Sequence, residues 1–161
     1  MKPVLLTICG WGPYKDKTEI DFREFDGHGL FLITGPTGAG KTTIFDAVCY
    51  ALFGDMSGST RTKETVRSDY AAAETKTYVE LVMTHEKQEY RIYRNPQYLR
   101  PKRRKSGTSE MVKEPENAIL YFPDGNAIEG NKEVNAKIKE VLSMDYEQFK
   151  QISMIAQGEF T

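Results

Sequence analysis

The sequence predicts a single α/β domain, or an α+β domain with a β-hairpin insertion, on the strength of three observations. The chain has 161 residues, the usual size of one compact domain, so we take residues 1–161 as one unit. Hydrophobic residues make up 39% of the chain, which is enough to bury one core. Short β-rich runs alternate with segments whose apolar residues recur at helical spacing.

Three strands are predicted in the first part of the chain. Residues 4–9 and 18–22 are short β-rich runs joined by a turn at Gly12 and Pro13. Residues 30–34 are continuously apolar, a pattern typical of a strand buried on both faces. We therefore expect this third strand inside the sheet, directly before a glycine-rich loop.

A helix is predicted from Thr42 onward, because apolar residues then recur at helical spacing until Gly54 provides a stop. The residues of this apolar face are Phe45, Val48, Cys49 and Leu52. Residues 56–75 are polar with little periodicity, which indicates a surface segment.

A hairpin and a further strand are predicted next. Residues 78–84 and 89–94 alternate in polarity around a turn at residues 85–88. Residues 118–122 are another β-rich run, and the Pro-Asp-Gly-Asn sequence at 123–126 is typical of a turn.

Two helices and a last strand are predicted near the C-terminal end. One helix presents an apolar face made of Val134, Ile138, Val141 and Leu142. Asp145 followed three residues later by Gln148 has the spacing of a helix start. Residues 152–155 are apolar enough to form a strand after it.

Charge and cysteine usage exclude several classes of protein. Lys and Arg number 22 against 23 Asp and Glu, so net charge alone indicates no particular partner. Cys9 and Cys49 lie in apolar contexts without neighbouring histidines, so we expect reduced core residues in a cytoplasmic protein and no zinc site. Residues 4–9 are typical of a strand and not of a signal peptide, and no apolar run reaches the ~20 residues that cross a bilayer. We expect no membrane contact.

The glycine-rich loop matches the Walker A pattern G-x-x-x-x-G-K-[ST] in full, between a predicted strand and a predicted helix. Glycines allow backbone N–H groups to surround phosphate oxygens, and the helix N-terminus adds partial positive charge. The pattern predicts a nucleotide site in which Lys41 reaches the β- and γ-phosphates, Thr42 binds Mg²⁺ and Thr43 donates to the α-phosphate. The predicted binding residues are Gly35, Pro36, Thr37, Gly38, Ala39, Gly40, Lys41, Thr42 and Thr43.

The loop alone leaves the reaction open. A GTPase requires an [NT]-K-x-D element, and the nearest match, residues 131–134, has Val134 where aspartate belongs. A small kinase stays an alternative, because a phosphate-clamping lid could be formed by Arg100, Lys102, Arg103 and Arg104.

Hydrolysis needs a carboxylate after an apolar strand to hold the metal ion. Residues 141–145 are a superficial match that ends at Asp145, with Glu147 nearby. Ser143 interrupts the apolar run, and its other members belong to a helical face, so a helix cap is the better interpretation of Asp145. The sequence thus predicts a nucleotide cradle without its catalytic carboxylates.

Several short segments add a further pattern when they are taken together. They are MKPVL (1–5), GPY (12–14), EIDF (19–22), LITGPTGAGKTTIFDA (32–47), RSDYA (67–71), DYEQFKQI (145–152) and AQGEF (156–160). In this order they resemble the N-terminal region of the SbcC family, bacterial DNA double-strand-break repair ATPases with ABC-type heads and long coiled coils.

The resemblance implies a P-loop NTPase fold, specifically the N-terminal lobe of an ABC-type ATPase head with a mixed sheet and a β-hairpin insertion. In that family the lobe ends at a Q-loop before the coiled coil, and the signature and Walker B motifs lie in a C-terminal lobe. By position, Gln157 would be the Q-loop residue that contacts the metal ion and the attacking water. Tyr14, Lys15 and residues 61–66 would contact the base or sugar.

The resemblance also implies partners. Two heads of this family sandwich two ATP molecules, and ATP binding controls a nuclease partner, SbcD, that acts on DNA ends. Residues 100–105 are a basic run that could contact DNA phosphates, with Tyr93 and Tyr98 as stacking residues. The alternative is a solvated insertion.

The function expected from all this is an ATP- and Mg²⁺-binding lobe that couples ATP binding and hydrolysis to DNA-end processing in repair and recombination. A stand-alone nucleotide- or DNA-binding module and a small P-loop kinase stay as alternatives. We expect the chain by itself to have almost no ATPase activity.

Overall fold

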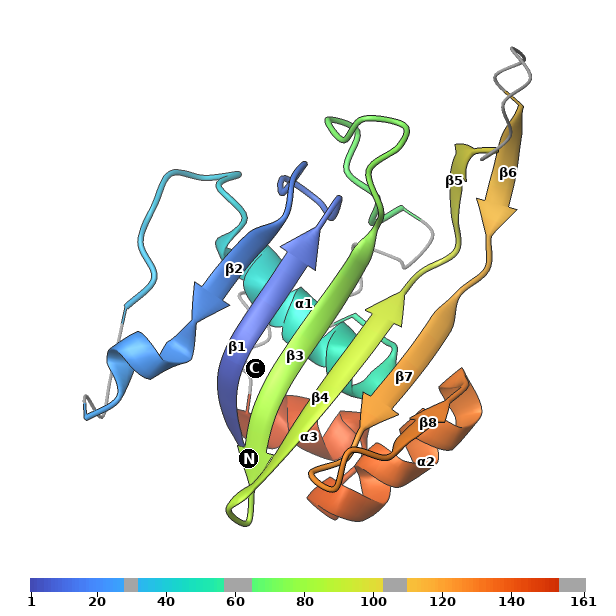
Figure 1. Cartoon of the computed structure of the whole chain (residues 1–161). Helices are drawn as coiled ribbons and strands as arrows, with labels where there is room; N and C mark the ends of the chain where they lie inside the picture. Colours follow the sequence, from blue (N-terminus) through green and yellow to red (C-terminus); the bar gives the residue numbers. More distant parts are fainter. Residues whose placement is uncertain (28–31, 57–64, 103–109, 154–161) are drawn as a thin grey trace.

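A computed structural model of the chain describes residues 1–27, 32–56, 65–102 and 110–153. Its main feature is a six-stranded sheet with the strand order β2-β1-β3-β4-β7-β8, next to a separate two-stranded ribbon, β5-β6 (Figure 1). The sheet consists of β1 (Lys2–Cys9), β2 (Thr18–Asp21), β3 (Tyr78–His85), β4 (Gln88–Asn95), β7 (Asn117–Tyr121) and β8 (Ala127–Glu129). The ribbon consists of β5 (Tyr98–Pro101) and β6 (Met111–Glu114).

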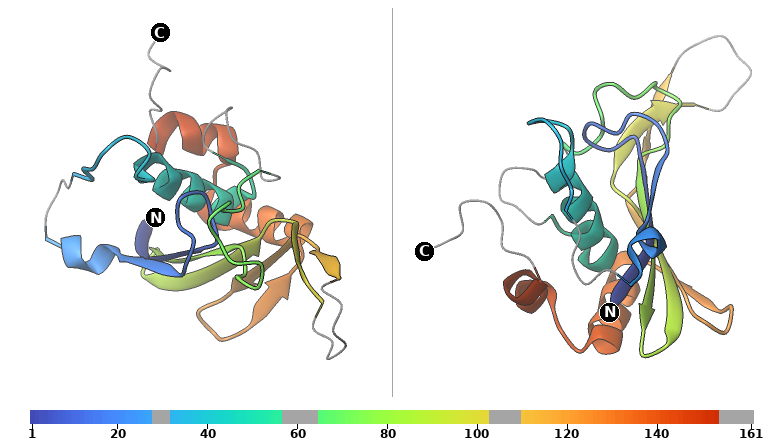
Figure 2. Two further views of the ribbon diagram at one scale, coloured as in Figure 1. Left: turned by 90° about the horizontal axis from the view of Figure 1, so that it is seen from above. Right: turned by 90° about the vertical axis from the view of Figure 1, so that its left-hand side faces the viewer.

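Among the described residues, three α-helices cover one face of this sheet (Figure 2). They are α1 (Lys41–Phe53), α2 (Asn131–Leu142) and α3 (Tyr146–Ser153), and a short 3-10 helix, η1 (Phe22–Phe25), follows β2. The described part of the chain therefore has two layers, helices on one face of a sheet, which agrees with the predicted combination of strands and helices in one domain. No helix in the described part of the chain is long and apolar enough to span a membrane.

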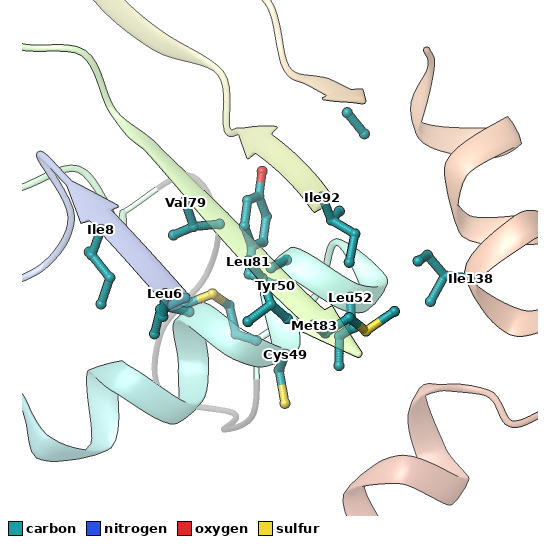
Figure 3. Packing of buried hydrophobic residues seen from close by; sticks show 14 of the residues in the cluster. Leu6, Ile8, Cys49, Tyr50, Leu52, Val79, Leu81, Met83, Ile92 and Ile138 are labelled. Carbon is teal, nitrogen blue, oxygen red and sulfur yellow. The ribbon is translucent and has the colours of Figure 1, made fainter. Parts of the chain in front are cut away.

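The core lies between α1 and the helix-facing side chains of β1, β3 and β4 (Figure 3). Alternate residues of each strand point to this side, because side chains of a strand alternate between the two faces. Fully buried examples are Leu6, Ile8, Val79, Leu81, Met83 and Ile92 on the strands, and Ala47, Cys49, Ala51 and Leu52 on α1. The two cysteines are buried and free, which confirms their prediction as reduced core residues.

The hairpin predicted around residues 85–88 is confirmed. β3 and β4 pair antiparallel, and the two turn residues Glu86 and Lys87 have φ angles of 50° and 66°. Two residues with positive φ give a turn whose twist matches the twist of the strands it joins. The first strand, the helix after the glycine loop, the strand near residue 120 and both C-terminal helices are confirmed as well.

The strand predicted at residues 30–34 is wrong in its described part. Residues 32–34 belong to no strand, and the side chain of Leu32 is 84% exposed. An apolar sequence forms a buried strand only where neighbouring strands supply hydrogen bonds, and this run has no such neighbour within the described residues. All pairs among the described strands are antiparallel, so the parallel pairing of a mixed sheet is absent from this part of the chain.

Other boundaries also differ from the prediction. β2 ends at Asp21, because Phe22 begins η1. Ile152 and Ser153 belong to α3, so the predicted strand at residues 152–155 is wrong where it is described. Phe45 is 45% exposed and does not belong to the core face of α1.

Candidate phosphate-binding site

The glycine loop (residues 35–42) leads into the N-terminus of α1, as the Walker A pattern predicts. Gly38 and Gly40 have φ angles of 85° and 89°, a left-handed backbone that glycine adopts with little strain. Gly40 is the N-cap of α1, and Lys41 is the first residue of the helix. The loop therefore lies at the positive end of the helix dipole, where anions are favoured.

The side chain of Lys41 folds back over the glycine loop. Its ammonium donates hydrogen bonds to the carbonyl oxygens of Gly35 at 2.8 Å and Pro36 at 2.9 Å. These contacts keep a positive charge beside residues 34–39, all of which are exposed. A phosphate group fits this set of donors, because a lysine ammonium and a helix N-terminus converge on one open loop.

The space around the two left-handed glycines differs. A Cβ atom added to Gly38 would meet nothing within 4 Å, so the loop is open to a ligand at this point. Thr42 is exposed in the first turn of α1, where its hydroxyl is accessible to a metal ion bound to phosphates. Thr43 is only 1% exposed and has a partner of its own, so its side chain faces the protein. In the described parts of the chain, no group of three or more His, Cys, Asp or Glu side chains could hold a metal ion.

Tyr14 contacts the glycine loop directly. Its hydroxyl donates to the carbonyl oxygen of Gly40 at 3.2 Å, and a Cβ atom on Gly40 would lie 2.7 Å from the Pro13 ring and 3.0 Å from the Tyr14 ring. Partial burial raises the pKa of Tyr14, so the hydroxyl keeps its proton at physiological pH. This contact was not predicted in this form, because sequence spacing does not show which loops meet.

The remaining predicted base or sugar contacts are only partly described. Lys15 is exposed, whereas Val66 is 2% exposed and its carbonyl accepts a hydrogen bond from the Gly12 amide. Val66 therefore acts as a core residue. Residues 61–64 and Gln157 lie outside the described residues.

Asp145 caps α3, as predicted. Its carboxylate accepts a hydrogen bond from the Gln148 amide at 3.1 Å, while the Gln148 side chain accepts one from the Asp145 amide at 3.0 Å. These reciprocal bonds form a capping box. The bond from the Gln148 amide lowers the pKa of Asp145, with a smaller contribution from Lys139. Within the described chain this carboxylate is thus committed to a helix end.

The basic run is partly neutralised in the β5-β6 ribbon. Arg100 forms an ion pair with Glu114, and Lys102 pairs with Glu110 at 2.5 Å. Arg103, Arg104 and Lys105 lie outside the described residues. The ribbon and the glycine loop lie towards opposite sides of the molecule (Figures 1 and 2), so Arg100 and Lys102 are not placed as a lid over the loop.

The two tyrosines proposed as base-stacking residues already contact other side chains. Tyr93 stacks on Tyr78 with ring centroids 5.3 Å apart. Tyr98 is 8% exposed, and the Arg67 guanidinium lies 5.0 Å from its ring centroid. Tyr98 is therefore buried, and at least one face of Tyr93 is already covered, which leaves little of either ring for base stacking.

Comparison with known proteins shows the family of this chain. Residues 5–161 match a family model described as an AAA domain. The chain belongs to this family. The description implies nucleotide binding, which agrees with a glycine loop at the start of a helix.

Three similar proteins are each the C subunit of the nuclease SbcCD from a different bacterium. This AAA domain is 40% identical over 164 residues to the SbcC subunit of the nuclease SbcCD from Vibrio cholerae. It is 38% identical over 165 residues to the SbcC subunit from Lactococcus lactis. The protein of the same name in Staphylococcus saprophyticus is 33% identical over 162 residues. The matches cover 99 to 100% of this chain but 16% of each relative. The chain is homologous to the N-terminal 16% of those SbcC proteins, which confirms the family resemblance.

Proposed function

We propose that the chain is the ATP-binding N-terminal lobe of an SbcC-type ATPase. The observation that supports this most strongly is Lys41, held over an open glycine loop at the positive end of α1. The 40% identity to an SbcC protein over nearly the whole chain supports ATP as the ligand. A phosphate-binding loop alone would explain similarity around residues 35–42 but not similarity over nearly the whole chain.

Each residue of the loop has a proposed role. Backbone amides of the glycine loop and the Lys41 ammonium bind the β- and γ-phosphates, and the exposed Thr42 hydroxyl is a ligand of the Mg²⁺ ion. Thr43 contributes at the α-phosphate, through its backbone amide because its side chain is buried. When bound, Mg²⁺ neutralises phosphate charge and orients the triphosphate. Gln157 is proposed to contact the metal ion and the attacking water, by its position in the family pattern.

The wider role is proposed from the relatives. ATP binding and hydrolysis in a complete head, paired with a second head, would control an SbcD-like nuclease that processes DNA ends in the cytoplasm. The basic run at residues 100–105 is the candidate DNA contact, and Arg103 and Arg104 are the residues to test because Arg100 and Lys102 already have carboxylate partners. Replacing both arginines with alanine should reduce the log–log salt slope of duplex binding by up to about 2. An unchanged slope would remove the basic run from the proposal.

Two alternatives are separated from this proposal by simple assays. A small P-loop kinase would transfer the γ-phosphate to an acceptor. The β5-β6 ribbon lies on the other side of the molecule from the glycine loop, which speaks against Arg100 and Lys102 as its lid. A stand-alone nucleotide- or DNA-binding module would show no gain in hydrolysis when the rest of an SbcC-type head is added.

The binding site itself is tested by the variant Lys41→Ala. Removing a charge-assisted hydrogen bond costs about 1.5–3 kcal/mol, so ATP·Mg²⁺ affinity measured by calorimetry should fall about tenfold or more. Lys132→Ala, which removes a lysine from the first turn of α2, is the matched control and should leave affinity unchanged. Equal affinity of Lys41→Ala and the parent chain would refute the site.

A further inference from the structure

The contact between Tyr14 and Gly40 joins two parts of the chain that are far apart in sequence. Tyr14 lies in the turn between β1 and β2, and Gly40 is the last residue before α1. The Tyr14 hydroxyl donates to the Gly40 carbonyl at 3.2 Å, while the Pro13 and Tyr14 rings occupy the space that a Cβ of Gly40 would fill. The turn is thus packed against the residue where the glycine loop becomes a helix.

Gly40 has a central position in the geometry of the loop. Its φ and ψ angles of 89° and 13° reverse the chain from the loop into α1. Its carbonyl oxygen accepts the first hydrogen bond of the helix, from the Ile44 amide at 3.3 Å, as well as the bond from Tyr14. The orientation of this one peptide sets the direction of the loop amides relative to the helix axis, and therefore to a bound phosphate.

The turn that carries Tyr14 is itself firmly held. Trp11 and Tyr14 exchange two backbone hydrogen bonds of 2.9 Å each, and the Gly12 amide donates to the Val66 carbonyl at 2.8 Å. The Trp11 ring is fully buried and packs on Tyr50 of α1 with ring centroids 4.7 Å apart. The turn therefore contacts α1 at two points, through Trp11 along the helix and through Tyr14 at its N-terminal end.

We propose that Tyr14 is a positioning residue of the phosphate site: through its hydrogen bond to the Gly40 carbonyl it holds the glycine loop in its phosphate-binding conformation, and it acts on the phosphates, not on the base or sugar. This inference rests on the proposed nucleotide-binding function. It assigns Tyr14 a different role from the base or sugar contact that the family resemblance implies. The hydroxyl is already engaged with the loop, and the ring is packed on Gly40.

The test compares two ligands in the variant Tyr14→Phe, which keeps the ring and removes the hydroxyl. The ligands are ATP·Mg²⁺ and inorganic tripolyphosphate with Mg²⁺, which has phosphates but no base or sugar. Because one hydrogen bond is lost between loop and turn, we expect the affinity for both ligands to fall by the same factor, about three- to tenfold.

Tyr90→Phe is the matched control for this variant. The Tyr90 hydroxyl donates to Gln88 at 3.1 Å, near the turn between β3 and β4. This turn lies at the opposite end of the sheet from Tyr14, because Tyr90 pairs with Met83 whereas Cys9, before the Tyr14 turn, pairs with Tyr78. Removing the Tyr90 hydroxyl should therefore leave both affinities unchanged.

A loss of folding is separated from a loss of positioning by measuring circular dichroism on the same samples. Affinities are compared at a temperature where the parent chain and both variants are fully folded. If Tyr14→Phe weakens the binding of ATP but not of tripolyphosphate, Tyr14 contacts the base or sugar and the proposal is overturned. Unchanged affinity for both ligands would also overturn the proposal. Binding of ATP but not of tripolyphosphate by the parent chain would overturn the proposal too. The nucleotide site would then still be supported by a loss of ATP affinity in Lys41→Ala. A parent chain that binds neither ligand would refute the proposed function itself.

Discussion

Gly38 and Gly40 have almost the same backbone conformation but different surroundings, which makes them a matched pair at the scale of single residues. Their φ angles are 85° and 89°. A Cβ on Gly38 would meet nothing within 4 Å, whereas one on Gly40 would lie 2.7 Å from Pro13. Alanine at Gly38 thus has only the strain of a left-handed backbone, while alanine at Gly40 also collides with a rigid ring.

We expect this difference to appear in stability. Gly38→Ala should lower the free energy of unfolding by about 1–2 kcal/mol, which is the cost of a left-handed backbone for a residue with a Cβ. Gly40→Ala should cost about 1–3 kcal/mol more, through overpacking. Urea unfolding of both variants measures this, and equal losses would contradict the close packing of Pro13 on the loop.

Arg94 is a residue whose role was not predicted from the sequence. It is 1% exposed on β4, and its guanidinium donates to the carbonyl oxygens of Ala51 at 2.8 Å and Leu52 at 3.1 Å near the end of α1. Burial lowers the pKa of Arg94 to about 10, so it stays charged at neutral pH. The available signal was its position two residues after Ile92, which places both side chains on the helix-facing side of the sheet.

At the scale of elements, the capping box of α3 gives a pH dependence with a definite sign. The pKa of Asp145 lies below its usual value of 3.8 because of the Gln148 amide. Its contribution to stability is therefore present above about pH 4 and is lost as the pH falls through the lowered pKa.

The variant Asp145→Asn keeps an acceptor oxygen but does not titrate. We expect the parent chain to have the higher unfolding temperature at pH 7, because a carboxylate also interacts with the helix dipole and Lys139. This advantage should shrink as the pH is lowered from about 5 to about 2.5, measured by thermal unfolding of both proteins. If the difference in unfolding temperature between the two proteins stays constant over this pH range, the charge of the Asp145 carboxylate does not stabilise the folded state.

Local sequence signals predicted most of the elements, and the errors arose where a neighbour was needed. The hairpin at residues 85–88 and the cap at Asp145 depend on residues close in sequence, so they were predicted correctly. Residues 30–34 have the composition of a buried strand, but composition does not supply a partner. The β5-β6 ribbon was missed because prolines and dense charge obscured its pattern, although Arg100 and Glu114 pair across it. For the site, the binding residues of the loop stay a prediction from the motif, while the packing of Tyr14 on Gly40 is a tertiary contact that a single sequence does not show.

At the scale of the whole molecule, we expect the chain to bind ATP but to hydrolyse it very slowly. The glycine loop supplies ground-state contacts, whereas rate enhancement comes from contacts made mainly in the transition state. Asp145, the candidate metal-binding carboxylate in the described chain, caps a helix. Phosphate release by the purified chain should be close to background, and adding the C-terminal lobe that the family resemblance implies should restore it.

Two variants check this expectation. In the reconstituted head, Gln157→Ala should lower turnover more than it lowers ATP affinity. Multiple turnovers by the chain alone, abolished by Asp145→Ala, would instead make Asp145 a catalytic carboxylate.

The pairing of β1 with β3 also predicts an order of assembly. β3 and β4 are joined by a two-residue turn, so their hairpin can form within microseconds. β1 pairs with β3 only after the whole stretch between Cys9 and Tyr78 has closed on itself, and such distant pairings are slow to form. The glycine loop and the turn that carries Tyr14 lie inside that stretch, so we expect them to reach their final conformation late in folding. We therefore expect a nucleotide to bind chains whose sheet is already complete, and so to stabilise the folded state without acting on the early steps of folding.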